Sequence, residues 1–184
     1  MGSYEVVVFC GSWPRGERAE EYLALARNFG GMLAGAGMKC LNGGSRGMMT
    51  AVSEGARAAG GLVHCVCLAE FPPDHEAYTS VESHRLLSVR QHALIHARNA
   101  YVALPGGYGT MFEVLDVVSR KALGEIPIDY PLICVGSEDF SDMKQLLSGI
   151  YRRGFGLRDP FELVKFVATP EAAMELLIAA RGAG

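Results

Sequence analysis

The chain has 184 residues, of which 49% are hydrophobic and 20% are charged, and its formal net charge at pH 7 is −3. This length and composition predict one globular domain over residues 1–184. The slight negative charge argues against a general nucleic-acid binder, and no apolar run of about 18 residues is present that could cross a membrane. We therefore expect neither nucleic acid nor a membrane as a partner.

The cysteines and the amino-terminal residues indicate the cellular compartment. The five cysteines follow no regular spacing, and the amino-terminal residues lack the basic segment of a secretory signal. Both features predict a reducing compartment and a cytoplasmic location.

The cysteines and histidines give no sign of a metal site. Cys65 and Cys67 lie in an apolar run and are expected to be core thiols. His92 and His96 have the spacing of two ligands on one helix face, but no third ligand is evident, so we expect a solvated or interface-facing pair.

Strands and helices are predicted to alternate along the chain. Short apolar runs bounded by glycine or proline turns predict strands over 5–10, 38–41, 62–68, 101–104, 131–135 and 163–168. Helical spacing of apolar residues and helix-ending glycines predict helices over 18–34, 48–59, 86–98, from 110 onward, 141–152 and 170–180. Residues 69–83, which include two consecutive prolines, are expected to form an irregular surface loop.

This alternation predicts an α/β fold of Rossmann-like type, in which a doubly wound, mostly parallel sheet is flanked by helices in three layers. Ligands of such sheets bind at the carboxyl ends of the strands, where the strand order reverses. Glycine-bearing turns follow three of the predicted strands, at residues 11–16, 42–47 and 105–109. We expect these turns to meet at one edge of the sheet and to form a ligand site.

The third of these turns is predicted to bind phosphate. A buried strand, the turn Pro105-Gly-Gly-Tyr-Gly109 and a helix opened by Thr110 follow one another directly. Glycines let an anion approach the backbone N–H groups of Gly106, Gly107 and Gly109, and the helix N-terminus carries unpaired donors and a positive dipole end. Thr110 is expected to cap the helix and to offer its hydroxyl to the same anion.

A purely structural alternative exists for this segment. Thr110 and Glu113 have the spacing of a capping box, in which their side chains only satisfy the first turn of the helix. The glycines would then only turn the chain. Three glycines within four positions are more than a turn requires, which favours the anion site.

The glycine turns of this chain resemble those of a known protein family. The segment Leu104-Pro-Gly-Gly-Tyr-Gly-Thr-Met-Phe-Glu113 resembles the PGGxGTxxE signature of the Lonely Guy family, many of whose members are called lysine decarboxylases. The segments 9–12 and 43–49 resemble the first and second glycine turns of that family, although the second is one residue shorter than the common plant form. The resemblance covers most of the chain.

Arg90 lies fifteen positions before Pro105, where the family has its catalytic arginine. Two neighbours depart from the family pattern, because Gln91 replaces a lysine and Leu94 replaces a methionine that is common there. These departures leave the preferred base open.

The resemblance implies hydrolysis of a nucleoside 5′-monophosphate, such as a cytokinin ribotide or AMP, to the free base and ribose 5-phosphate. It also implies a homodimer or a higher homo-oligomer, and we expect no cofactor. Breaking an N-glycosidic bond creates positive charge on the ribose, which a carboxylate can stabilise while it orients water. We assign this role to Glu113, with Arg90 holding it or binding a substrate oxygen. The predicted phosphate ligands are Gly11, Ser12, Gly43, Gly44, Gly106, Gly107, Gly109 and Thr110.

Three other functions compete with this hydrolysis. A pyridoxal-phosphate decarboxylase needs a Schiff-base lysine, and none of the four lysines lies in a glycine turn, so we reject it. A second alternative is a carrier of a nucleotide-like ligand, as in the related molybdenum-cofactor carrier proteins. Such a carrier needs the phosphate-binding glycine turn but not the pair of Arg90 and Glu113. A specialised pyrimidine nucleotide hydrolase stays open because of the shortened second turn and the unusual loop at 70–83.

Overall fold

The computed structural model describes residues 3–73 and 75–183 of the chain. In this part of the molecule the strands form one seven-stranded sheet in which all neighbours are parallel, in the order β4-β3-β2-β1-β5-β6-β7. The strands are β1 (Glu5–Phe9), β2 (Lys39–Asn42), β3 (Val63–Leu68), β4 (Ser80–His84), β5 (Ala100–Ala103), β6 (Leu132–Val135) and β7 (Lys165–Val167). The predicted α/β class is therefore confirmed.

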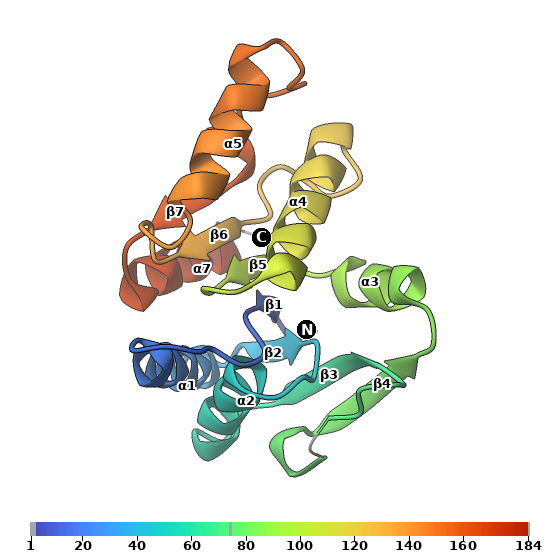
Figure 1. Ribbon diagram of the computed structural model, residues 1–184. Helices are drawn as coiled ribbons and strands as arrows, with labels where there is room; N and C mark the ends of the chain where they lie inside the picture. Colours follow the sequence, from blue (N-terminus) through green and yellow to red (C-terminus); the bar gives the residue numbers. More distant parts are fainter. Residues whose placement is uncertain (1–2, 74, 184) are drawn as a thin grey trace.

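Helices cover both faces of the sheet, as Figure 1 shows. They are α1 (Ala19–Gly35), α2 (Met48–Ala58), α3 (Leu87–Ile95), α4 (Tyr108–Leu123), α5 (Ser141–Arg152), α6 (Pro160–Leu163) and α7 (Pro170–Ala183), with a 3₁₀ turn η1 (His75–Ala77). One apolar core joins α1, α2 and α7 to the sheet, and a second core joins α3, α4 and α5 to the opposite face. The central strands are buried on both faces, which explains their continuous apolar sequences.

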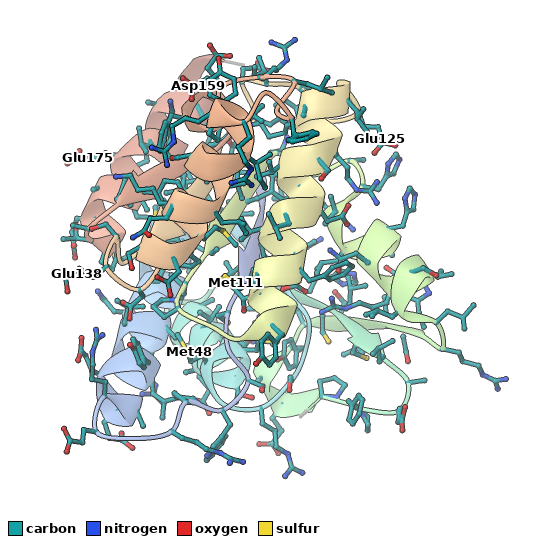
Figure 2. The ribbon with its side chains drawn as sticks, turned by 45° about the horizontal axis from the view of Figure 1, so that its top comes forward. Met48, Met111, Glu125, Glu138, Asp159 and Glu175 are labelled. Atoms are coloured by element: carbon teal, nitrogen blue, oxygen red, sulfur yellow. The ribbon has the colours of Figure 1, made fainter. Side chains whose placement is uncertain are left out.

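The strand order reverses between β1 and β5. Gly11, after β1, donates a backbone hydrogen bond to the carbonyl of Pro105, after β5, at 3.1 Å. The turn after β2 lies on the adjoining strand, so the three glycine turns meet at the carboxyl edge of the sheet, as expected for this topology. In Figure 2, Met48 and Met111 mark the first turns of α2 and α4, which start at this edge.

The prediction of an irregular loop over 69–83 was wrong at its end, because β4 begins at Ser80 and pairs in parallel with β3. The strand lies at the edge of the sheet and carries one apolar residue, Val81, so its sequence lacks a strand-like apolar pattern. Polar contacts across the two strands accompany the backbone pairing: His64 Nδ1 lies 2.8 Å from Ser80 Oγ, and His64 Nε2 lies 3.5 Å from Glu82 Oε2. The short helix α6 was not predicted either.

The first two helices pack closely because glycines stand at their contact. A Cβ on Gly30 of α1 would overlap the carbonyl oxygen of Val52 in α2, and one on Gly55 of α2 would overlap the carbonyl oxygen of Arg27 in α1. We therefore expect Gly30→Ala to lower the free energy of unfolding by about 1–3 kcal/mol, the usual cost of overpacking a core. Urea denaturation monitored by circular dichroism would measure the change.

Gly35→Ala is the matched control, because it lies in the same helix and a Cβ there meets no atom within 4 Å. This variant should be unchanged or more stable by up to about 0.5–1 kcal/mol, since alanine loses less conformational entropy in a helix. Equal effects of the two substitutions would contradict the close contact between α1 and α2.

Candidate functional site

A cleft of about 370 Å³ opens at the carboxyl edge of the sheet, where the strand order reverses. Residues from four strand ends and from the starts of α3 and α4 line it, so segments distant in sequence meet there. All but two of the predicted site residues are among them, namely Gly11, Ser12, Gly43, Arg90, Gly107, Gly109, Thr110 and Glu113.

The central feature of the cleft is a buried ion pair. Arg90 Nη1 donates to Glu113 Oε1 at 2.7 Å, and each side chain is only 9% exposed. Arg90 belongs to α3 and Glu113 to the second turn of α4, so the packing of the two helices creates the pair. Arg90 Nε also donates to the carbonyl oxygen of Val66 in β3 at 2.9 Å, which anchors the guanidinium to the sheet.

One polar atom of each partner stays free for a ligand. Among the described residues, neither Arg90 Nη2 nor Glu113 Oε2 has a hydrogen-bond partner, and neither atom is fully buried. The guanidinium passes against Gly43, where any Cβ would overlap Nη2. Glycine at this position therefore gives the Arg90 side chain access to the cleft. The pair can present an N–H donor and a carboxylate oxygen side by side.

Burial raises the pKa of the Glu113 carboxyl above its ordinary value, the nearby Arg90 cation lowers it, and the Asp116 carboxylate raises it further. The effect of burial is the largest, so the pKa of Glu113 lies above its ordinary value. Glu113 can therefore take up a proton closer to neutral pH than an exposed glutamate does. Cys10 faces the same carboxyl, and its own pKa is raised well above the usual range, first by burial and then by the Glu113 charge. Cys10 is therefore a neutral thiol and not a nucleophile at this site.

The N-terminus of α4 faces the cleft beside the ion pair. The helix begins at Tyr108, two residues earlier than predicted, with Gly107 as its N-cap and no side-chain cap. Its first backbone bond runs from Met111 N to the Gly107 carbonyl, so the N–H groups of Tyr108, Gly109 and Thr110 precede the regular bonding. These donors and the helix dipole suit an anion.

The capping-box alternative is wrong, and so is the prediction that Thr110 caps the helix. Neither Thr110 nor Glu113 caps the first turn, and Glu113 binds Arg90 instead. The side chain of Thr110 lies in the wall of the cleft and is only 2% exposed.

Two predicted phosphate ligands do not line the cleft. Gly44 is buried with a φ of +74°, its N–H bonds the Asn42 side chain at 2.9 Å, and a Cβ would overlap Cys65 Sγ. Its role in the structure is to turn the chain. Gly106 packs against Gly11 and lies beside a neighbouring cavity of about 310 Å³ that shares Gly11, Ser12 and Gly107 with the cleft.

Apolar side chains that the sequence analysis did not single out form the other walls, namely Met49, Leu68, Phe71 and Leu87. Leu68 is the last residue of a predicted strand, so the rule that ligands bind at strand ends could have identified it. Phe71 lies in the loop after β3 and carries no sequence signal for a site. Tyr108 also lines the cleft and is 98% exposed.

No group of three or more His, Cys, Asp or Glu side chains suited to a metal occurs within residues 3–73 and 75–183. His92 and His96 stack with ring centroids 4.7 Å apart and are exposed on α3 and just after it. Over the same described ranges, none of the helices is long and apolar enough to span a membrane.

Fold and site together define a Rossmann-like α/β protein with a glycine-rich turn at its topological switch point. A family described as "Possible lysine decarboxylase" matches residues 49–177, and the chain belongs to this family, which is the Lonely Guy family that its glycine turn resembles.

Curated relatives carry the name cytokinin riboside 5′-monophosphate phosphoribohydrolase. One from Rhodococcoides fascians is 32% identical over 65% of this chain and 62% of its own length. A probable one from Oryza sativa is 37% identical over 64% of this chain and 49% of its own, so the chain spans only half to two thirds of the length of these two relatives. One from Mycobacterium tuberculosis is 28% identical over 84% of this chain and 82% of its own length.

Solved structures share the fold. The molybdenum cofactor carrier protein of Chlamydomonas reinhardtii has a TM-score of 0.72 at 22% identity, with 98% of this chain and 99% of that chain covered. The molybdenum cofactor binding protein of Rippkaea orientalis has a TM-score of 0.71 at 19% identity, with 97% and 98% covered. At these identities the likeness concerns the architecture alone.

Proposed function

We propose that this chain hydrolyses the N-glycosidic bond of a nucleoside 5′-monophosphate to the free base and ribose 5-phosphate. The observation that carries the proposal is the buried pair of Arg90 and Glu113, which faces the same cleft as the N-terminus of α4. An anion site and a carboxylate that line one cleft suit the phosphate and the C1′ end of a ribose 5-phosphate. The names of the curated relatives support the same reaction class.

In this reaction the bond between C1′ of the ribose and the base nitrogen breaks, and its electron pair leaves with the base, which gains a proton. Positive charge develops on the ribose, as in glycoside hydrolysis. The Glu113 carboxylate stabilises that charge and takes a proton from the water that bonds to C1′. Arg90 holds Glu113 through Nη1, and its free Nη2 can bind a ribose oxygen.

The phosphate is proposed to bind the N–H groups at the start of α4, with the Thr110 hydroxyl and the turn at Gly11 and Ser12 beside them. Binding energy from this distant group would fix the reacting bond against Glu113. The apolar walls formed by Leu68 and Phe71 then suit the base. We also propose that the chain acts as a homodimer or a higher homo-oligomer, as the family resemblance implies.

A substrate panel tests the proposal. Purified protein is incubated with AMP, isopentenyl-AMP, GMP and CMP and with the matching nucleosides, and free base is followed by chromatography. Release from at least one monophosphate, but not from its nucleoside, is expected, because the nucleoside lacks the anchoring phosphate. The base that is released fastest identifies the preferred substrate and distinguishes purine from pyrimidine hydrolysis.

The competing proposal is a carrier that binds a nucleotide-like ligand without cleaving it. It predicts that a monophosphate raises the melting temperature while no base is released from any member of the panel. That result would overturn the hydrolase proposal. Base release would in turn exclude a purely non-catalytic carrier.

We expect the rate to depend on the ionisation of Glu113. Its carboxylate is the active form, and burial raises its pKa despite Arg90. The rate constant kcat/KM should therefore fall as the pH drops, with a midpoint above the ordinary range of a glutamic acid. A pH–rate profile at fixed ionic strength measures this. A midpoint at or below about 4.3, the ordinary value for glutamate, would contradict the assignment.

A further inference from the structure

A line of polar contacts continues from Arg90 away from the cleft, between α3 and α4. Arg90 Nη1 donates to Gln91 Oε1 at 3.2 Å, and Gln91 Nε2 donates to Asp116 Oδ2 at 3.1 Å. Asp116 Oδ1 accepts from Arg120 Nε at 2.8 Å. Arg120 Nη1 ends the line on Glu125 Oε2 at 3.0 Å, and Glu125 is exposed beyond the far end of α4 from Met111 (Figure 2).

The two neighbours of Gln91 determine the orientation of its amide. Arginine only donates and an ionised aspartate only accepts, so the amide oxygen must face Arg90 and the nitrogen must face Asp116. Gln91 is 3% exposed, so water has little access to replace either contact. The reversed amide would place donor against donor and acceptor against acceptor, which is costly for buried groups.

We propose that Gln91 and Asp116 are positioning residues, which act through Arg90 to hold Glu113 and to direct the free N–H group of Arg90 into the cleft. The proposal rests on the proposed hydrolysis. The guanidinium of Arg90 is planar, and its contacts with the Val66 carbonyl and with Gln91 fix that plane without any help from Glu113. Glu113 therefore meets a cation whose place is already set.

The same line adds no positive charge next to Glu113. Gln91 is neutral, and Glu113 is faced by Arg90 from α3, by Asp116 from its own helix and by Cys10 from the end of β1. A lysine at position 91 would offer no acceptor to Arg90 and would bring a second cation, whereas the neutral glutamine accepts from Arg90.

Gln91→Met tests the proposal, because methionine keeps the length and the apolar bulk of the side chain but offers no comparable acceptor. We expect kcat to fall by about 100-fold, since small displacements of catalytic groups have effects of this size, while KM changes little. In ¹⁵N NMR spectra, the Arg90 Nε–H signal should exchange with solvent faster than in the wild type. A wild-type kcat together with unchanged exchange would overturn the proposal.

Glu125→Gln is the matched control. It removes the charge of the exposed outer partner of Arg120, and such surface ion pairs contribute little. Its kcat and its Arg90 Nε–H exchange should equal those of the wild type. A fall in kcat as large as that of Gln91→Met would overturn a role specific to Gln91.

Asp116→Asn provides a second variant in case Gln91→Met does not fold. It keeps the size of the side chain but removes the charge that orients Gln91, so faster Arg90 Nε–H exchange and a lower kcat are again expected. Unchanged exchange would overturn the proposal. The NMR comparison needs no turnover, so a wild type that releases no base overturns the proposed function, while the exchange rates still decide the positioning roles.

Discussion

Replacing Glu113 with glutamine should slow base release strongly while leaving nucleotide binding intact. The amide keeps the shape of the side chain and can still accept from Arg90, but it can neither take a proton from water nor stabilise the positive charge on the ribose. We expect kcat to fall by about 10²–10⁴-fold, the usual contribution of a positioned general base. Rapid-quench or chromatographic rates at saturating monophosphate would measure the loss, and isothermal titration calorimetry would measure binding.

The structure also predicts how this variant changes stability. Because the Glu113 pKa is raised in the folded state, the folded protein binds more protons than the unfolded chain between the ordinary and the raised pKa. The contribution of Glu113 to stability is therefore fully present at low pH and is lost as the pH rises through the raised pKa. Glutamine cannot ionise, so the stability of Glu113→Gln has no such dependence on pH. As the pH rises, the melting temperature of this variant should therefore increase relative to that of the wild type.

Two results would contradict these expectations. Turnover within about tenfold of the wild type would exclude Glu113 as the base, because general bases contribute more than that. Weakened nucleotide binding with unchanged turnover would make Glu113 a binding residue only. Ser148→Ala, on the exposed face of α5, is a suitable control and should match the wild type in both assays.

Much of the fold followed from the sequence because buried parallel strands and glycine turns have strong local signals. The alternation of apolar runs and helices was sufficient to predict the α/β class, and the topology then brought the glycine turns to one edge. The edge strand β4 escaped prediction because it pairs with β3 without an apolar pattern, with polar contacts from His64 beside the pairing. An apolar pattern arises where side chains are buried, and few side chains of this edge strand are buried.

The candidate site was predictable to a similar extent and for a similar reason. The spacing of the glycines indicated the turn that lines the cleft. The family resemblance indicated Arg90 and Glu113, and in the structure Arg90 Nη1 lies 2.7 Å from Glu113 Oε1. Their link to Gln91 and Asp116 was not predictable, because it depends on how α3 packs against α4. A residue such as Phe71, which reaches the cleft from an irregular loop, has no periodic neighbours that could reveal it.

Arg90→Met should be harmful in a different way from Glu113→Gln. Methionine retains the unbranched apolar part of the side chain but leaves the Glu113 carboxylate in a buried position without its cation. Removing one partner of a buried ion pair costs about 3–5 kcal/mol of stability, because the remaining charge is unpaired. Without Arg90 the pKa of Glu113 should rise further, so the variant should lose stability relative to the wild type as the pH increases, and kcat should fall with it.

The double variant Arg90→Met with Glu113→Gln separates the ion pair from the packing of the two side chains. It contains no unpaired charge, so it should be more stable than Arg90→Met alone at pH 8, although its kcat should be as low as that of Glu113→Gln or lower. Urea denaturation of the wild type, both single variants and the double variant completes the cycle. Additive losses would show that Arg90 and Glu113 do not interact in solution, and the short contact between α3 and α4 would then not describe the working site.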